Sequence, residues 1–165
     1  MRDIYLISDT HFGHANIIKY CNRPFTSAEE MDAAMVERWN RTVRPQDHIY
    51  HLGDVAMGQA ALHRVMPQLN GHKRLLLGNH DNQAPMKDYA RYFDKILVWR
   101  LFKPVIFTHV PIHQGSFGKA TVNAHGHVHN SPSPSGPYIN LSCEMWDYTP
   151  VHLDVILQLA RDRGE

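Results

Sequence analysis

Short runs of mainly apolar residues recur along the chain, and each run is followed by polar residues or glycine. Runs of this length with such boundaries are typical of buried β-strands. Five of them predict strands at residues 4–7, 49–52, 74–77, 105–107 and 121–124. The stretches 138–143 and 151–153 are also largely apolar and predict two further strands in the later half of the chain.

Elsewhere, the spacing of apolar residues predicts helices at 29–43, 59–66 and 154–163. In the first of these, Met31, Met35 and Trp39 lie four residues apart and therefore share one face. Thr26 and Glu29 have the spacing of a capping box that would begin this helix. Because strands alternate with helices, the pattern predicts an α/β fold.

The first five strands share one further feature, since each is followed closely by His, Asp or Asn. The residues concerned are Asp9 and His11, Asp54, Asn79 with His80 and Asp81, His109, and His127 with His129. In layered α/β folds, ligands bind at the carboxyl ends of the strands. Five strand ends that carry such side chains therefore predict one shared polar site.

Two of these groups have a spacing of two residues. In an extended chain such side chains point the same way, so Asp9 with His11, and His127 with His129, could each reach one ion. Each pair taken alone is also found in ordinary polar surface strands. Gly78 lets the backbone turn sharply after a buried strand, so that the three residues after it can face one site.

The composition is that of an ordinary globular chain, with 43% hydrophobic and 20% charged residues among 165. This length predicts one domain over residues 1–165. The formal charge of +1 argues against a protein that binds extended nucleic acid mainly through charge, because such proteins are far more basic.

Neither a membrane span nor a secretory signal is expected. The longest unbroken apolar run, at 96–99, has four residues, whereas a spanning helix needs about 20 and a secretory signal needs about 7–15 near the N-terminus. We therefore expect a cytoplasmic protein without a membrane partner, in which Cys21 and Cys143 stay reduced.

The order of the polar blocks resembles that of a known family, the calcineurin-like metallophosphoesterases. Its five blocks are matched by Asp9-x-His11, Gly53-Asp54, Gly78-Asn79-His80-Asp81, Thr108-His109 and Gly126-His127-x-His129. Segments 7–14 and 140–146 resemble a compact microbial and phage branch. The resemblance implies two β-sheets packed as a sandwich and flanked by helices, in αββα layers.

The resemblance also implies a role for the polar residues of the blocks. One metal ion would be held by Asp9, His11 and His129, and the other by Asn79, His109 and His127. Asp54 would bridge the two ions, and His80 would face the phosphate as general acid.

Charge and two-metal chemistry agree with these roles. Two divalent ions with two carboxylates and one hydroxide leave roughly one positive charge, which matches the single charge of a phosphodiester. A hydroxide bridging the ions would attack phosphorus in line, and a protonated His80 would donate to the leaving oxygen. Nitrogen and oxygen ligands without thiolate favour manganese, with iron, zinc, cobalt or nickel as alternatives.

One position departs from the protein Ser/Thr phosphatase branch of this family. That branch has a second aspartate that pairs with the acid histidine, and here Met57 stands in its place. Met57 argues against a phosphoprotein phosphatase and leaves Asp81 as the candidate group that orients His80. The alternative for Asp81 is a loop aspartate that accepts backbone N–H bonds.

Two residues outside the blocks are candidates for substrate binding. Arg23 could direct two hydrogen bonds to a substrate phosphate, and His14 follows the first block closely enough to lie near it. The alternatives are a solvated loop cation for Arg23 and a surface or supporting histidine for His14. His51 and His125 precede ligands and could support them through hydrogen bonds.

We therefore expect a metal-dependent phosphodiesterase that uses two divalent ions and acts on small phosphate esters of nucleotide type. A phosphomonoesterase, a nuclease with the same site and a non-catalytic metal-binding scaffold protein are the alternatives. The sequence leaves the oligomeric state open.

Overall fold

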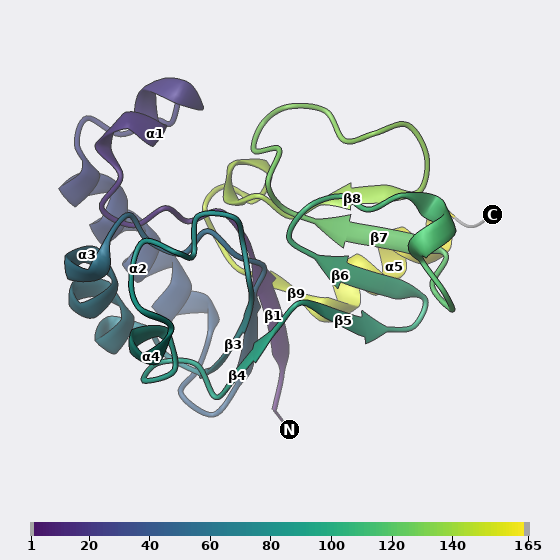
Figure 1. Ribbon diagram of the computed structural model, residues 1–165, viewed down its shortest axis with the longest axis horizontal. Helices are drawn as coiled ribbons and strands as arrows, with labels where there is room; N and C mark the ends of the chain where they lie inside the picture. The colour runs from purple at the N-terminus through teal and green to yellow at the C-terminus, as the bar shows by residue number, and fades with distance from the viewer. Residues whose placement is uncertain (1, 164–165) are drawn as a thin grey trace.

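The computed structural model describes residues 2–163, and two β-sheets dominate it (Figure 1). The first sheet contains β1 (Ile4–Ile7), β2 (His48–His51), β3 (His72–Leu76), β4 (Lys95–Leu97) and β9 (Val151–His152). The second contains β5 (Trp99–Phe102), β6 (Val105–Thr108), β7 (Val122–His125) and β8 (Tyr138–Asn140). The helices are α1 (Ala15–Tyr20), α2 (Ala28–Thr42), α3 (Gln59–Val65), α4 (Met86–Tyr89) and α5 (Leu153–Asp162). Short 3-10 helices cover Met66–Gln68, Gln114–Ser116 and Cys143–Trp146.

Both sheets are mixed. In the first, the order is β4-β3-β2-β1-β9, and only β9 runs antiparallel to its neighbour. In the second, the order is β5-β6-β7-β8, where β5 is antiparallel to β6 and the other pairs are parallel. The carboxyl ends of β1, β2 and β3 therefore lie at one edge of the first sheet, and those of β6 and β7 at one edge of the second.

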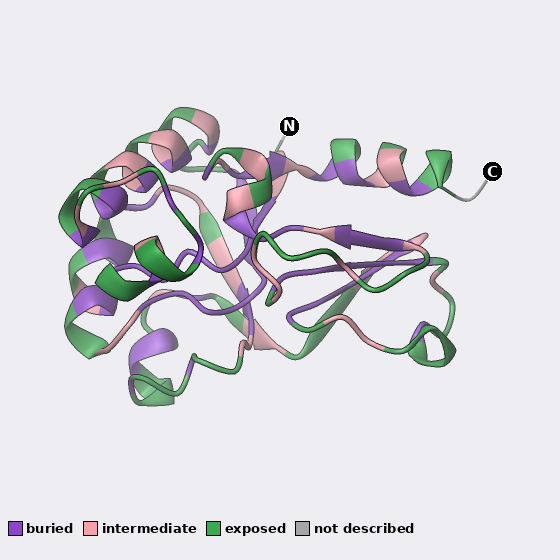
Figure 2. Ribbon diagram, turned by 90° about the horizontal axis from the view of Figure 1, so that it is seen from above, coloured by how far each residue is buried: buried purple, intermediate pink, exposed green. Residues whose placement is uncertain are grey.

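The carboxyl halves of β1, β2 and β3 are buried on both faces, which explains the apolar residues that lead into the loops. Ile7, Ile49 and Leu75 point toward the helices α1 to α4, while Leu6 and Tyr50 point toward the second sheet. Figure 2 shows the buried residues gathered along these two interfaces. The alternation of one side chain toward each face is the two-residue period of a β-strand.

Helix α2 fills the space on the outer side of the first sheet. Its face of Met31, Met35 and Trp39, predicted from their spacing, is at most 1% exposed. The indole of Trp39 also donates from Nε1 to the carbonyl oxygen of Asn70 at 3.0 Å, which satisfies its polar edge inside the core.

The second sheet is covered differently on its two faces. Val105 and Phe107 of β6 face the first sheet and share a core with Ile156 of α5. Ile106, between them, points to the other face, where Phe117 and Tyr138 join it in a small separate cluster. Segment 110–120, rather than a long helix, covers this outer face.

The predicted α/β fold with two packed sheets and flanking helices is confirmed, and its predicted strands and helices are all present within one to three residues at their ends. The stretch at 138–143 is shorter than predicted, because Cys143 already belongs to a 3-10 helix. Leu153 begins α5 instead of ending a strand.

Among the α-helices and strands of residues 2–163, four were not predicted, namely α1, α4, β4 and β5. The apolar run at 96–99 hides the last two, because the chain passes from the first sheet to the second within it. Val98 at the crossing is 72% exposed, so the run is not one buried strand. Helices α1 and α4 are too short to show a helical period. In residues 2–163, no helix combines the length and the apolar character needed to cross a bilayer.

The start of α2 lies one residue later than the predicted capping box. Ser27 is the N-cap, and its hydroxyl accepts from the backbone N–H of Glu30 at 3.1 Å. The Glu30 carboxylate in turn accepts from the backbone N–H of Thr26 at 2.7 Å. Glu29 therefore does not take the capping position that its distance from Thr26 suggested.

Removing the Ser27 hydroxyl should destabilise the start of α2. We expect Ser27→Ala to lower the free energy of unfolding by about 1 kcal/mol, because one N–H of the first turn loses its acceptor. Urea unfolding followed by circular dichroism measures this change. Ser135→Ala, at an exposed loop serine, is the control and should change stability by less than about 0.5 kcal/mol.

Candidate metal centre

Five loops meet where the carboxyl ends of β1, β2 and β3 in the first sheet lie beside those of β6 and β7 in the second (Figure 1). Backbone hydrogen bonds join the loops beyond the strands themselves. The N–H of Asp9 donates to the carbonyl of Gly53 at 3.0 Å, and that of His11 donates to the carbonyl of Asp54 at 3.0 Å. Beyond the second sheet, the N–H of Gly126 donates to the carbonyl of His109 at 2.8 Å, and the N–H of Cys143, after β8, donates across the sheets to the carbonyl of Ser8, after β1, at 3.0 Å. These bonds join the first predicted block to the second and the fourth to the fifth.

Two glycines allow the second and third loops to touch through their backbones. Gly53 has a φ of +100°, and a Cβ there would lie 2.5 Å from the backbone nitrogen of Gly78. A Cβ on Gly78 would in turn overlap the Asp54 carboxylate. Only glycine fits at both positions, which explains why each precedes a site residue.

The site residues themselves adopt an unusual backbone. Asp9, His11, Asp54, His127 and His129 all have positive φ values, between 50° and 72°. The extended geometry predicted for the two i, i+2 pairs is therefore wrong, since each member lies in the left-handed region. The side chains still converge on one site, with each of these residues in a left-handed backbone conformation. Such backbone strain gathers at functional sites.

The first group of donors is Asp9, His11 and His129, whose ligand atoms all lie within 4.8 Å of one another. The Asp9 carboxylate is fully buried and accepts from the backbone N–H of His127 at 2.9 Å and from the Ser142 hydroxyl at 3.1 Å. His129 Nε2 lies 3.9 Å from Asp9 Oδ1. This group lies deep, with His11 only 3% exposed.

The second group lies nearer the surface. Asn79 Oδ1 is 2.9 Å from His109 Nε2 and 2.9 Å from His127 Nδ1. His109 Nδ1 is 2.7 Å from the carbonyl oxygen of Leu52, so Nδ1 carries a proton and Nε2 is the nitrogen directed toward the site. Asn79 and His127 are exposed, whereas His109 is buried.

Asp54 lies between the two groups. Its Oδ2 is 3.5 Å from His11 Nε2, in the first group, and 3.4 Å from His109 Nε2, in the second. Its Oδ1 accepts from the backbone N–H of His80 at 2.8 Å. One carboxylate oxygen thus faces a nitrogen donor of each group.

These donors fit divalent metal ions. His11 Nε2 is buried and has no hydrogen-bond partner among residues 2–163, although it points toward a carboxylate oxygen. Such a nitrogen beside a carboxylate is an environment that a metal ion satisfies. Imidazole, carboxylate and amide donors without thiolate suit ions such as manganese, iron and zinc.

The protonation states agree with metal binding. Burial lowers the pKa of His11 to about 3, which keeps its imidazole neutral. Burial alone would raise the pKa of Asp54, but the hydrogen bond and charge of a protonated His109 outweigh it and hold that pKa at about 2; Asp54 and Asp9 in turn raise the pKa of His109. A neutral imidazole and an ionised carboxylate are the forms that bind a cation.

His80 and His14 both lie beside His11. The ring centroids of His80 and His11 are 5.6 Å apart, and those of His14 and His11 are 5.5 Å apart. His80 is exposed at the mouth of the site. Burial, followed by the charge of Arg23, lowers the pKa of His14. The structure brings both side chains to the site, and their roles stay predictions.

Asp81 does not orient His80. Its Oδ2 accepts from the backbone N–H groups of Gly78 at 2.7 Å and Asp54 at 2.9 Å, and its Oδ1 accepts from that of Val55 at 2.9 Å. The side chain is 3% exposed and faces the backbone. The expectation of a catalytic Asp81 is therefore wrong, and the alternative of a loop aspartate describes it. Asp81 holds the second and third loops together.

Arg23 is likewise not placed for a substrate phosphate. Its guanidinium is fully buried, donates to the carbonyl oxygens of Asp9 at 2.7 Å and Thr10 at 2.9 Å, and pairs with Glu144 Oε1 at 2.6 Å. All of its donors are directed into the protein. The expected substrate contact is corrected to a structural one, in which Arg23 fixes the backbone of the first loop.

Glu144 is the site residue that sequence reasoning missed. Its Oε1 accepts from His129 Nδ1 at 2.9 Å, which leaves Nε2 of that ring toward Asp9. Burial alone would raise the pKa of Glu144, but the His129 hydrogen bond and the Arg23 charge hold it at about 2. The only signal in the sequence was its place in the segment 140–146, which resembles the compact branch.

His51 and His125 support the loops from behind. His51 Nδ1 accepts from the backbone N–H of Gly53 at 3.1 Å, so Nε2 donates to the Thr10 hydroxyl at 2.8 Å. That hydroxyl donates to the carbonyl oxygen of Val55 at 2.8 Å. Burial lowers the pKa of His51 to about 3, which keeps this chain of bonds intact. The buried ring of His125 lies 2.8 Å from the Gly126 carbonyl.

Comparisons with known proteins agree with this geometry. A family model described as calcineurin-like phosphoesterase matches residues 2–163. The uncharacterized protein MJ1445 of Methanocaldococcus jannaschii is 37% identical, over 96% of this chain and 92% of that protein. The gene 66 protein of Mycobacterium phage L5 is 33% identical over 52% of this chain and 43% of that protein.

Two solved structures share the fold. The protein AQ665 of Aquifex aeolicus, described as of unknown function, has a TM-score of 0.74 and 26% identity, and the match covers 96% of this chain and all of that one. The nuclease MPE of Pseudomonas putida has a TM-score of 0.54 and 20% identity, over 78% of this chain and 62% of that one.

Replacing Glu144 should weaken metal binding without removing a ligand. We expect Glu144→Gln to reduce the affinity for Mn²⁺ at one of two sites by roughly 10–100-fold, because His129 loses its anionic acceptor. Isothermal titration calorimetry measures both sites. Glu37→Gln, on the exposed side of α2, is the control. Equal Mn²⁺ affinity in the two variants would contradict the role given to Glu144.

Proposed function

Because the chain belongs to the calcineurin-like phosphoesterase family, we propose that it hydrolyses phosphodiesters with two divalent ions held at the candidate metal centre. The observation that carries this proposal is the position of Asp54. One oxygen of its carboxylate lies within 3.5 Å of a nitrogen donor in each of the two groups. A carboxylate so placed can serve two ions at once.

The proposed ligands fall into the two groups described above. Asp9, His11 and His129 would hold one ion, Asn79, His109 and His127 the other, and Asp54 both. When bound, such a pair of ions activates water and stabilises charge on phosphoryl oxygens. We propose manganese as the native ion, since nitrogen and oxygen donors suit it, with iron, zinc, cobalt and nickel as alternatives.

His80 is proposed as the general acid for the leaving oxygen. Its backbone N–H is fixed to Asp54 Oδ1 at 2.8 Å, which keeps the residue beside the shared carboxylate. Its side chain is exposed, so it can reach a substrate without displacing a ligand. His14, whose ring centroid lies 5.5 Å from that of His11, is proposed to contact the substrate phosphate.

A diester fits the charge of the loaded site better than a monoester. Two divalent ions, two carboxylates and one hydroxide leave roughly one positive charge, which a phosphodiester neutralises. The chain as a whole carries a formal charge of +1, which favours small esters over a long phosphate backbone. We therefore propose small, nucleotide-type phosphodiesters as substrates.

Replacing His80 should reduce turnover while leaving metal binding intact. We expect His80→Asn to lower kcat on bis-p-nitrophenyl phosphate by about 10²–10⁴-fold, since a positioned general acid contributes that much. Elemental analysis should find the same metal content as in the unchanged protein. His72→Asn, at the opposite end of β3, is the matched control and should keep full activity. Normal turnover by the His80 variant would refute the acid role.

The choice between diester and monoester is tested with a pair of chromogenic substrates. We expect a higher kcat/KM for bis-p-nitrophenyl phosphate than for p-nitrophenyl phosphate in the presence of Mn²⁺, because the diester matches the site charge. A clear preference for the monoester would overturn the proposal. Rapid cleavage of single-stranded DNA, with activity that falls steeply as salt rises, would instead identify a nuclease.

A further inference from the structure

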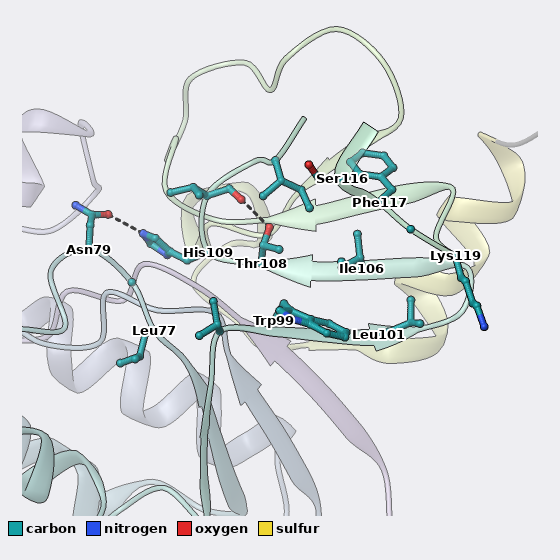
Figure 3. A pocket seen from close by; sticks show the side chains of 15 residues that line it. Leu77, Asn79, Trp99, Leu101, Ile106, Thr108, His109, Ser116, Phe117 and Lys119 are labelled. Carbon is teal, nitrogen blue, oxygen red and sulfur yellow. Dashed lines mark hydrogen bonds between the residues drawn. The ribbon is translucent and has the colours of Figure 1, made fainter. Parts of the chain in front are cut away.

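A cavity of about 730 Å³ opens on the outer face of the second sheet (Figure 3). Cavities of about 300–1,000 Å³ are the size that holds small organic ligands. Most of its lining is apolar and comes from β5, β6 and the segment after β6. The main side chains are Trp99, Leu101, Ile106, Phe117, Val98 and Val110.

One end of this cavity is formed by the candidate metal centre. Asn79 and His109, which belong to the second group of donors, line the cavity as well as the centre (Figure 3). A phosphoester with its phosphorus at the centre would therefore have one of its organic groups beside or inside the cavity. The cavity and the site of hydrolysis are parts of one surface.

The cavity exposes large apolar side chains to water. Trp99 is 57% exposed, Val98 72% and Val110 41%. An exposed indole offers a flat face on which another ring can stack. Phe117 is fixed at the far wall, because its ring packs against that of Tyr138 with centroids 5.7 Å apart. These surfaces would be buried by a planar ligand.

Polar groups border the apolar lining. Ser116 and Lys119 are exposed at the rim away from the metal centre, and the Asn79 amide lies at the near end. The Thr108 hydroxyl, by contrast, is already used, since it donates to the carbonyl of Val110 at 2.6 Å and accepts from Asn123 at 2.9 Å. A heterocycle can use these rim groups while its face stacks, whereas a hydrocarbon chain cannot.

A second copy of the chain is a poorer occupant. A stable interface covers about 800 Å² on each partner, and a partner seated here would also cover Asn79 and His109. A second copy would therefore block the access of substrate to the second group of donors. We propose that the cavity binds a nucleobase or a similar heteroaromatic group of the phosphoester. This inference rests on the proposed function, because it names the organic group of that substrate.

The test compares two phosphates that differ only in their organic group. Calorimetry with the Mn²⁺-loaded protein should show that adenosine 5′-monophosphate binds roughly 5–100-fold more tightly than methyl phosphate. We expect this difference because one base stacks on the side chains of the cavity. Trp99→Ala should abolish this preference and leave the affinity for methyl phosphate unchanged. Trp99→Phe should retain most of it. Val155→Ala, at an exposed apolar position on α5, is the control.

The outcomes separate this inference from the proposed hydrolysis. If bis-p-nitrophenyl phosphate is hydrolysed but the two phosphates bind equally well, the nucleobase site is refuted and the esterase stands. If no ester is hydrolysed but the preference for the nucleotide depends on Trp99, the site is supported and the proposed function fails. If light scattering finds a dimer that Trp99→Ala dissociates, a second copy occupies the cavity and the inference is overturned.

Discussion

The convergence of seven donor side chains at one edge of two sheets is the constraint on which the rest of the structure depends. Their nitrogen and oxygen atoms lie about 3–4 Å from one another, as the contacts around Asp54 and Asn79 show. Neighbouring lone pairs and carboxylates repel, and five of the residues also have left-handed backbones that cost about 1–3 kcal/mol each. The surrounding fold must hold them in place.

Buried polar side chains behind the loops provide that support. Asp81 binds three backbone N–H groups, Arg23 binds two backbone carbonyls, and His51 links the first and second loops through Thr10. Each of these side chains contacts backbone rather than solvent. Removing one would leave buried donors or acceptors unpaired, which is costly inside a protein. The donor geometry therefore depends on residues that do not face the site.

The two groups of donors differ in how far they are enclosed by the protein. The group around Asp9 is enclosed by the buried pair of Glu144 and Arg23. The group around Asn79 opens to solvent and to the apolar cavity. The proposed organic-group site therefore lies on the second sheet and the segment that covers it, next to the more open group of donors. The first sheet and its helices mainly provide rigidity.

The sequence pattern by itself determined the α/β class, the main strands and helices, and the convergence of the five polar blocks, because the periodicity of a strand is local and sites in layered α/β folds lie at strand ends. The arrangement in two packed sheets was implied only by the resemblance of those blocks to the family. The sequence did not determine which buried polar residues face the site. Asp81 and Arg23 carry groups that suit catalysis or phosphate binding, and Glu144 lies far from the blocks in sequence. Only the tertiary structure decided their roles. A carboxylate or guanidinium forms hydrogen bonds and ion pairs with the groups that lie within about 3 Å of it, and those neighbours come from distant parts of the chain.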